Sequence, residues 1–159
     1  MSALPRNSPW GEVQHCECLI DGVFLVSTAS HGGVMVRKNA AGFLSQEARS
    51  IALNERNYLC FEEDCDEAVV IRELLDKKLW RLPDRISDKA GYKDAIDRSL
   101  MQWHPDYWEY RKQTFIASVA EDSIAPSLAN RLGAGKAKAA AYIPATDKKA
   151  PQQHHAEVI

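Results

Sequence analysis

A histidine beside two glycines is, by residue type, the best candidate for a general base in this chain of 159 residues. His31 follows Ser30 and precedes Gly32-Gly33, and an unperturbed imidazole titrates near neutral pH. In a catalytic arrangement, Ser27, Thr28 or Ser30 would supply a hydroxyl, and Asp64 or Asp66 would orient the imidazole. No G-x-S-x-G nucleophile elbow accompanies them. The preferred interpretation is structural, with His31 hydrogen-bonded to backbone groups of a tight turn, and catalysis is the alternative.

Cys65 is a second candidate nucleophile for that alternative. A helix is predicted to begin near this residue, and the positive end of a helix lowers the pKa of a thiol. The acidic neighbours of Cys65 act in the opposite direction, because negative charge favours the protonated thiol. No catalytic residue is therefore assigned firmly, and a small hydrolase or transferase that uses His31 with Asp64 and Cys65 or Ser30 remains the alternative function.

The acidic run and the cysteines do not predict a metal site. Neighbouring helical residues point about 100° apart, so contiguous carboxylates seldom converge on one cation, and the helix dipole already accounts for their position. The cysteine pairs 16/18 and 60/65 lack the usual spacings of zinc ligands. We expect neither a metal nor another cofactor. The acidic residues of the run are Glu62, Glu63, Asp64, Asp66 and Glu67.

An aromatic stretch around residue 105 is the predicted partner-binding site. Trp, Tyr and Arg are the residue types that dominate binding hot spots. In a continuous helix, two of the aromatic residues share one face and Trp108 lies on another, so both faces are not easily buried in one small core. The competing interpretation is that aromatic residues at helical spacing belong to the core. The predicted contact residues are Trp103, Tyr107, Trp108, Tyr110 and Arg111.

Apolar runs predict an antiparallel three-stranded meander over residues 13–37. The strands cover residues 13–20, 24–28 and 34–37. Asp21-Gly22 separates the first two strands and is typical of a type I′ hairpin turn, in which both central residues have positive φ. His31 then lies at the bend between the second and third strands.

Helices are predicted after the meander. Ser45 caps a helix over residues 46–53, and Asp64 with Glu67 forms a capping pair for a helix over residues 65–80. Periodic apolar residues predict further helices over residues 90–103 and from Pro105 to residue 117 or beyond. Between the helices, residues 38–42 are predicted as a loop, residues 54–57 as a break, and residues 58–61 as a fourth strand or the start of the next helix.

This order of elements predicts an α+β fold, in which an N-terminal antiparallel meander packs against three or four helices. A flexible arm is expected at residues 1–9 and a single domain at residues 10–125. Residues 126–159 are rich in alanine and lysine and then polar, which predicts a flexible, partly disordered tail.

Charge and hydropathy narrow the function classes. The formal net charge of −2 does not favour direct nucleic-acid binding through a broad basic surface. No run approaches the roughly eighteen apolar residues of a membrane span, and the N-terminal residues lack the pattern of a signal peptide. We therefore expect a cytoplasmic protein that makes no membrane contact.

Three blocks of the sequence carry a resemblance. Pro9-Trp10-Gly11, then V-S-T-A-S-H-G-G at residues 26–33, then E-D-C-D-E-A at residues 63–68, resemble an uncharacterised family of bacterial domains found on phages, plasmids and other mobile elements. The resemblance covers residues 8–75 and carries no established activity. It implies an accessory protein of a mobile element that disarms host defence, such as an inhibitor of a CRISPR or restriction system.

The first function expected is therefore a non-catalytic protein of the bacterial cytoplasm. It binds and inhibits a host protein or protein–nucleic-acid complex through residues 103–111. Self-association as a homodimer is left open.

Overall fold

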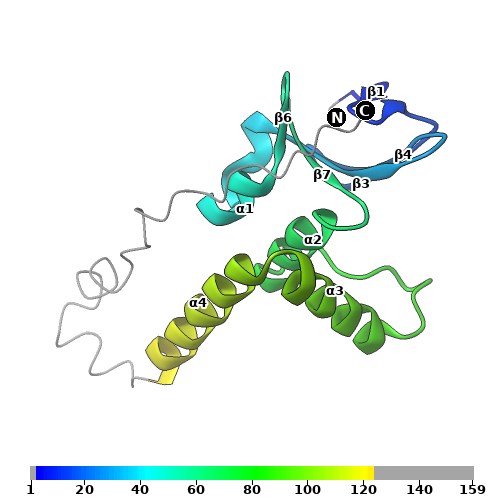
Figure 1. Ribbon diagram of the computed structural model, residues 1–159. Helices are drawn as coiled ribbons and strands as arrows, with labels where there is room; N and C mark the ends of the chain where they lie inside the picture. The colour runs from blue at the N-terminus through cyan, green and yellow to red at the C-terminus, as the bar shows by residue number, and fades with distance from the viewer. Residues whose placement is uncertain (1–2, 124–159) are drawn as a thin grey trace. The chain divides into compact units, whose positions relative to one another are not determined.

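The computed structural model describes residues 3–123 (Figure 1). The chain divides into two units, Met1–Trp108 and Glu109–Ile159. The predicted tail at residues 126–159 lies outside the described residues. In the described part, no helix combines the length and the apolar character that a membrane span requires.

An antiparallel five-stranded sheet forms the centre of the first unit. Its order is β3-β4-β5-β7-β6, which confirms the predicted meander as β3, β4 and β5, and the predicted fourth strand as β7. Both faces of the central strand β5 are covered, since its residues from Gly32 to Val36 are buried. The strands are β3 (His15–Ile20), β4 (Val23–Ser27), β5 (Gly32–Arg37), β6 (Leu53–Glu55) and β7 (Tyr58–Glu62).

Different segments of the chain pack against the two faces of the sheet. On one face, a cluster of Phe24, Val26, Met35 and Cys60 packs with partly buried residues that include Trp10 of the N-terminal segment. The alternate residues of β5 and β7 are also buried, and helix α2 (Glu67–Asp76) contacts both strands. Burial of each such side chain stabilises the fold by roughly 1.5–3 kcal/mol. The result is the predicted α+β fold, with the sheet above α2 in Figure 1.

The β3–β4 hairpin turns at Asp21-Gly22 as predicted, but not with the predicted type I′ geometry. Among the described non-glycine residues, positive φ occurs only at Arg56 and Lys78, so Asp21 has negative φ while Gly22 has φ +82. The register also shifts between Cys18 and Ile20. This irregularity in β3 allows a turn with a single residue of positive φ to connect the strands.

The prediction of a flexible arm at residues 1–9 does not hold for residues 7 and 8, which form a strand. Strand β1 (Asn7–Ser8) pairs with β2 (Gly11–Glu12), and the Ser8 hydroxyl accepts a hydrogen bond from the backbone N–H of Trp10 at 3.2 Å. Pro9 and Trp10 form the turn between these strands, and Gly11, the first residue of β2, follows it with φ +125. These local contacts position Trp10 over the sheet.

Two predictions between residues 38 and 57 are also corrected. Residues Lys38–Phe43 form a 3₁₀ helix, η1, in place of a loop. Helix α1 (Gln46–Ile51) begins at the predicted cap, where the Ser45 hydroxyl accepts from the N–H of Ala48 at 3.1 Å. It ends before residue 53 because Leu53–Glu55 pairs with β7 as strand β6.

The remaining helices begin close to the predicted positions. Helix α3 (Lys89–Trp103) is capped by Asp88, which accepts from Gly91 N–H at 2.8 Å, and α4 (Pro105–Ser123) starts at Pro105. Helix α2 is shorter than predicted. The Asp64–Glu67 capping pair is wrong, because Asp66 occupies the N-cap position and makes no side-chain cap hydrogen bond.

Candidate functional site

One end of the sheet brings the three resemblance blocks together. Gly33 at the start of β5 pairs with Glu62 at the end of β7, and the backbone N–H of Glu63 donates to Gly32 O at 3.0 Å. The indole of Trp10 lies directly over Gly33, where an added Cβ would come within 2.6 Å of it. Segments around residues 10, 32 and 63 therefore form one surface at this end of the sheet.

His31 closes the turn between β4 and β5 through its backbone. Its carbonyl oxygen accepts from Thr28 N–H at 2.7 Å and lies 2.8 Å from the Thr28 hydroxyl, which in turn accepts from His31 N–H at 3.2 Å. The exposed imidazole forms no hydrogen bond with any residue from 3 to 123, so it is not joined to Asp64 or Cys65 there. Ser30 is exposed on the same turn. The arrangement does not assemble the catalytic set of the alternative function.

Cys65 lies in the turn between β7 and α2, which we call the acidic turn (Glu62–Glu67). Its thiol is 3.5 Å from a carboxylate oxygen of Glu62 and donates toward it. Burial, together with the negative charges of Asp66 and Glu62, raises the pKa of the Cys65 thiol well above its ordinary value. Because the thiolate is the nucleophilic form, this environment does not activate Cys65.

Asp66 instead joins the acidic turn to the junction of α3 and α4. Its Oδ1 lies 2.8 Å from His104 Nε2, and each of the two side chains is 18% exposed. The residues are 38 positions apart. No local pattern in the sequence links the two positions, so this contact could not be predicted from the sequence.

Glu67, the first residue of α2, titrates near neutral pH. Burial and the charges of Glu63 and Asp64 raise its pKa from 4.5 to about 7. Glu67 also contributes, after burial, to the raised pKa of Tyr92 on α3. The acidic turn therefore changes its charge in the physiological pH range.

We expect Glu67→Gln to make the protein more stable at pH 8 but not at pH 4. The raised pKa of Glu67 means that the folded state holds its proton more tightly than the unfolded state. This contribution is full below about pH 4.5 and is lost as the pH rises to about 7. Urea unfolding at pH 4, 6 and 8 should show a gain of about 1–3 kcal/mol at pH 8. Glu12→Gln, at an exposed position, is the control. An equal effect of Glu67→Gln at all three pH values would contradict the assignment.

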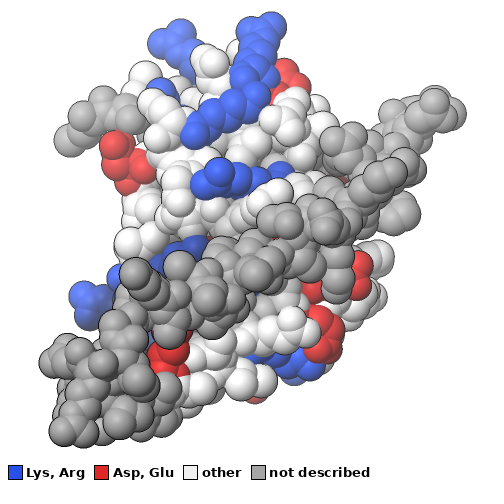
Figure 2. All heavy atoms as spheres, turned by 90° about the vertical axis from the view of Figure 1, so that its left-hand side faces the viewer, with Lys and Arg blue, Asp and Glu red and all other residues white. Residues whose placement is uncertain are grey.

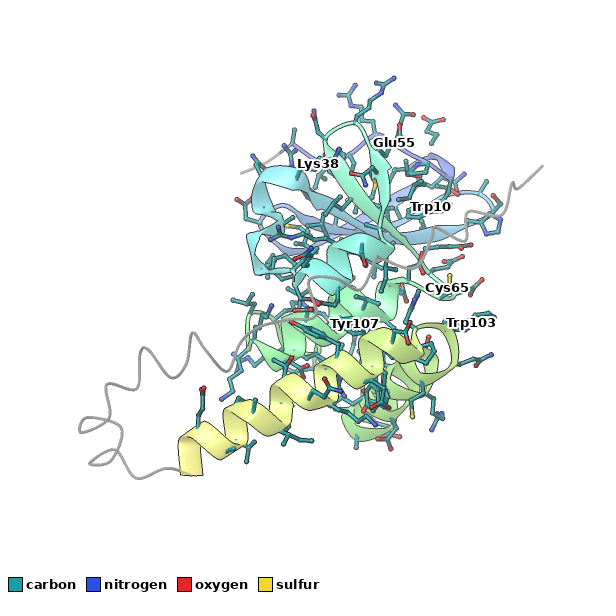
Figure 3. All side chains as sticks on the ribbon, turned by 60° about the vertical axis from the view of Figure 1, so that its left-hand side comes forward. Trp10, Lys38, Glu55, Cys65, Trp103 and Tyr107 are labelled. Carbon is teal, nitrogen blue, oxygen red and sulfur yellow. The ribbon has the colours of Figure 1, made fainter. Side chains whose placement is uncertain are left out.

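The predicted partner-binding residues differ widely in exposure. Trp103 at the end of α3 is 54% exposed, whereas Tyr107 is only 4% exposed. Trp108, Tyr110 and Arg111 are half-buried. Figure 3 shows Trp103 on the same side of the first unit as Cys65. Of the five predicted contact residues, Trp103 presents the largest fraction of its surface to a partner.

Tyr107 belongs to a buried polar cluster that the sequence did not predict. Its hydroxyl donates to Glu73 Oε1 at 3.2 Å, and the Ser45 hydroxyl donates to the same oxygen at 2.5 Å. Lys77 Nζ lies 2.6 Å from Glu73 Oε2. The cluster joins α1, α2 and the first turn of α4. Tyr107 is therefore a packing residue in this structure, not a surface contact.

Among residues 3–123, no three His, Cys, Asp or Glu side chains are grouped so as to hold a metal ion. On the face drawn in Figure 2, basic side chains lie toward the upper end with acidic side chains beside them, and further basic and acidic side chains lie toward the lower end. The described surface that is visible in this view shows no broad area of a single charge.

The first unit is an α+β domain built on an antiparallel sheet. Residues 3–128 match the family described as a domain of unknown function (DUF7007), and the chain belongs to this family. The matched range includes α3 and α4, beyond the residues 8–75 that carried the resemblance. A search of curated proteins and a search of solved structures each found no match.

Proposed function

We propose that this chain is a non-catalytic binding protein, and that Trp103 at the α3–α4 junction is its principal contact residue. The observation that carries this proposal is the 54% exposure of Trp103 in a segment whose neighbours are anchored. His104 contacts Asp66 and Tyr107 contacts Glu73. An aromatic side chain on a preorganised backbone loses little entropy on binding, and Trp is the residue type most typical of hot spots.

The proposed partner is a host-defence protein or protein–nucleic-acid complex in the bacterial cytoplasm, such as a CRISPR or restriction complex. This part of the proposal is supported by the resemblance to domains of phages, plasmids and other mobile elements. Inhibition would result from occupation of a functional surface. A homodimer would present two copies of Trp103, which light scattering of the purified protein would reveal.

We expect Trp103→Ala to weaken partner binding by about 2–4 kcal/mol, or roughly 30- to 1,000-fold. The stability of the chain should change by less than about 0.5 kcal/mol, because the side chain is exposed. Wild-type and variant proteins would be used to capture partners from bacterial lysate, with identification by mass spectrometry. Met101→Ala, at a large apolar residue 46% exposed on the same helix, is the matched control.

A protein retained by the wild type and Met101→Ala but lost with Trp103→Ala would support the proposed surface. Retention of that protein by Trp103→Ala would place the contact elsewhere. Phage plaquing on hosts with and without a CRISPR or restriction system tests the inhibitory role, and His31→Ala and Cys65→Ser should inhibit as the wild type does. Loss of inhibition with either of these two variants would favour the catalytic alternative.

A further inference from the structure

We propose that Cys16 and Cys18 form a two-coordinate binding site for a soft metal ion, Cu(I), at the edge of the sheet. The site involves strand β3 and none of the residues proposed to contact a partner, so it stands independently of the proposed function. It also differs from a zinc site, for which the spacing of these two cysteines is unsuitable.

Strand β3 places both thiols on one face of the sheet. Residues 15–18 pair with β4 in continuous register, with Cys16 opposite Val26 and Cys18 opposite Phe24, and the register shifts only after Cys18. Alternate residues of a regular strand point to the same face. The two thiols are therefore neighbours on the face that carries Val26 and Phe24, with no irregularity of the backbone between them.

The thiol pair is open to solvent on one side and rests on apolar side chains on the other. Strand β3 is the outermost strand of the five-stranded sheet. Both cysteines are free, Cys18 is exposed and Cys16 is half-buried. Cys16 packs against the buried cluster that includes Phe24 and Val26. An ion can thus reach the sulfurs from solvent, while the apolar cluster limits the access of competing water from beneath.

The separation of the two side chains suits one ion held by two sulfurs. Residues i and i+2 of a strand are about 6.5 Å apart, and rotation about χ1 moves each sulfur toward the other. A metal–thiolate bond is about 2.3 Å long, so an ion in linear coordination holds its sulfurs roughly 4.6 Å apart. Rotation of Cys18 breaks only the weak hydrogen bond from its thiol to Ile20 O at 3.2 Å, which a deprotonated sulfur cannot donate.

The donor set selects the kind of ion. Thiolates are soft ligands that favour Cu(I), an ion that accepts linear coordination by two sulfurs. Structural Zn²⁺ takes four ligands, and within residues 3–123 no third His, Cys, Asp or Glu side chain forms a metal-binding group with this pair. The carboxylate between the two cysteines, that of Glu17, belongs to the opposite face and forms an ion pair with Arg85 at 2.8 Å.

Competition for Cu(I) with the chromogenic chelator bicinchoninate, under anaerobic and reducing conditions, tests this site in the full chain. The wild type should remove a single equivalent of Cu(I) from the chelator. Cys18→Ser, at an exposed position, should weaken Cu(I) binding by roughly 100-fold or more, because loss of a ligand exceeds the roughly 10- to 100-fold effect of losing a group that supports one. Cys65→Ser removes a half-buried thiol outside β3 and is the matched control, which should bind Cu(I) as the wild type does.

Cys16→Ser tests the other ligand and should lose Cu(I) to the same extent, once circular dichroism has shown that the variant is folded. X-ray absorption of the wild-type Cu(I) adduct should show two sulfur neighbours. Failure of the wild type to take Cu(I) from the chelator would overturn the proposal, as would equal affinity in Cys18→Ser or nitrogen or oxygen neighbours of the bound ion. Light scattering should give the same mass with and without Cu(I), and an increase would overturn the site within one chain by showing that the ion joins two copies.

Discussion

Gly33→Ala is expected to cost about 3 kcal/mol or more of folding free energy. Gly33 has φ +156, and a Cβ at this position would lie 2.1 Å from the carbonyl oxygen of Phe61 and 2.6 Å from the indole of Trp10. The Phe61 carbonyl belongs to the neighbouring strand β7 and cannot move without disrupting the sheet. Urea unfolding followed by circular dichroism measures the loss.

Gly42→Ala is the matched control for this substitution. Gly42 lies in η1, and an added Cβ there would meet no atom within 4 Å. Its stability should remain within about 0.5 kcal/mol of the wild type. A loss below 1 kcal/mol for Gly33→Ala would show that Trp10 and strand β7 move apart easily, and that the close contacts at Gly33 do not make this end of the sheet rigid.

Tyr107→Ala is expected to destabilise the protein by about 3–5 kcal/mol, because a large buried aromatic side chain is replaced by a cavity. Tyr107 is 4% exposed, and its hydroxyl is one of two that donate to Glu73 Oε1. Any loss of partner binding in this variant would then follow from unfolding. Thermal and urea unfolding, measured before any binding assay, establish this point.

Tyr107→Phe separates the ring from its hydroxyl. The ring still fills the space, and Ser45 and Lys77 still contact the Glu73 carboxylate, so we expect a loss of only about 1 kcal/mol. The pair of variants also discriminates between the two interpretations of the aromatic stretch. If Tyr107→Ala remained as stable as the wild type and bound its partner less tightly, Tyr107 would be a surface contact and its role in packing would be wrong.

The two stability predictions concern the elements that position the proposed binding surface. Gly33 allows Trp10 to cover the end of the sheet where the acidic turn begins, and Tyr107 anchors the first turn of α4 directly after Trp103 and His104. Trp103 is 54% exposed and is expected to contribute little to stability, which makes it suitable for a test of binding. Gly33→Ala and Tyr107→Ala should therefore lower the stability of the protein, whereas Trp103→Ala should weaken partner binding without a loss of stability.

Much of the fold could be predicted from the sequence because its signals are local. The meander follows from apolar alternation and from the Asp21-Gly22 turn, α1 begins at the hydroxyl of Ser45, and α4 begins at Pro105. In each case the deciding interaction lies within a few residues along the chain. Strand β6 was missed because three residues carry too short a pattern, and their assignment depends on pairing with β7.

The sequence by itself determined which residues could take part in the candidate site, and the tertiary structure alone decided how they are used. Trp103 and Tyr107 are both aromatic residues of the same predicted helical stretch, yet Trp103 is exposed and Tyr107 is buried. Asp66 and His104 are 38 residues apart, and Glu73 and Tyr107 are 34 apart. Such contacts depend on how α2, α3 and the start of α4 pack against one another. No periodicity or motif in one segment specifies which side chain another segment will place against it.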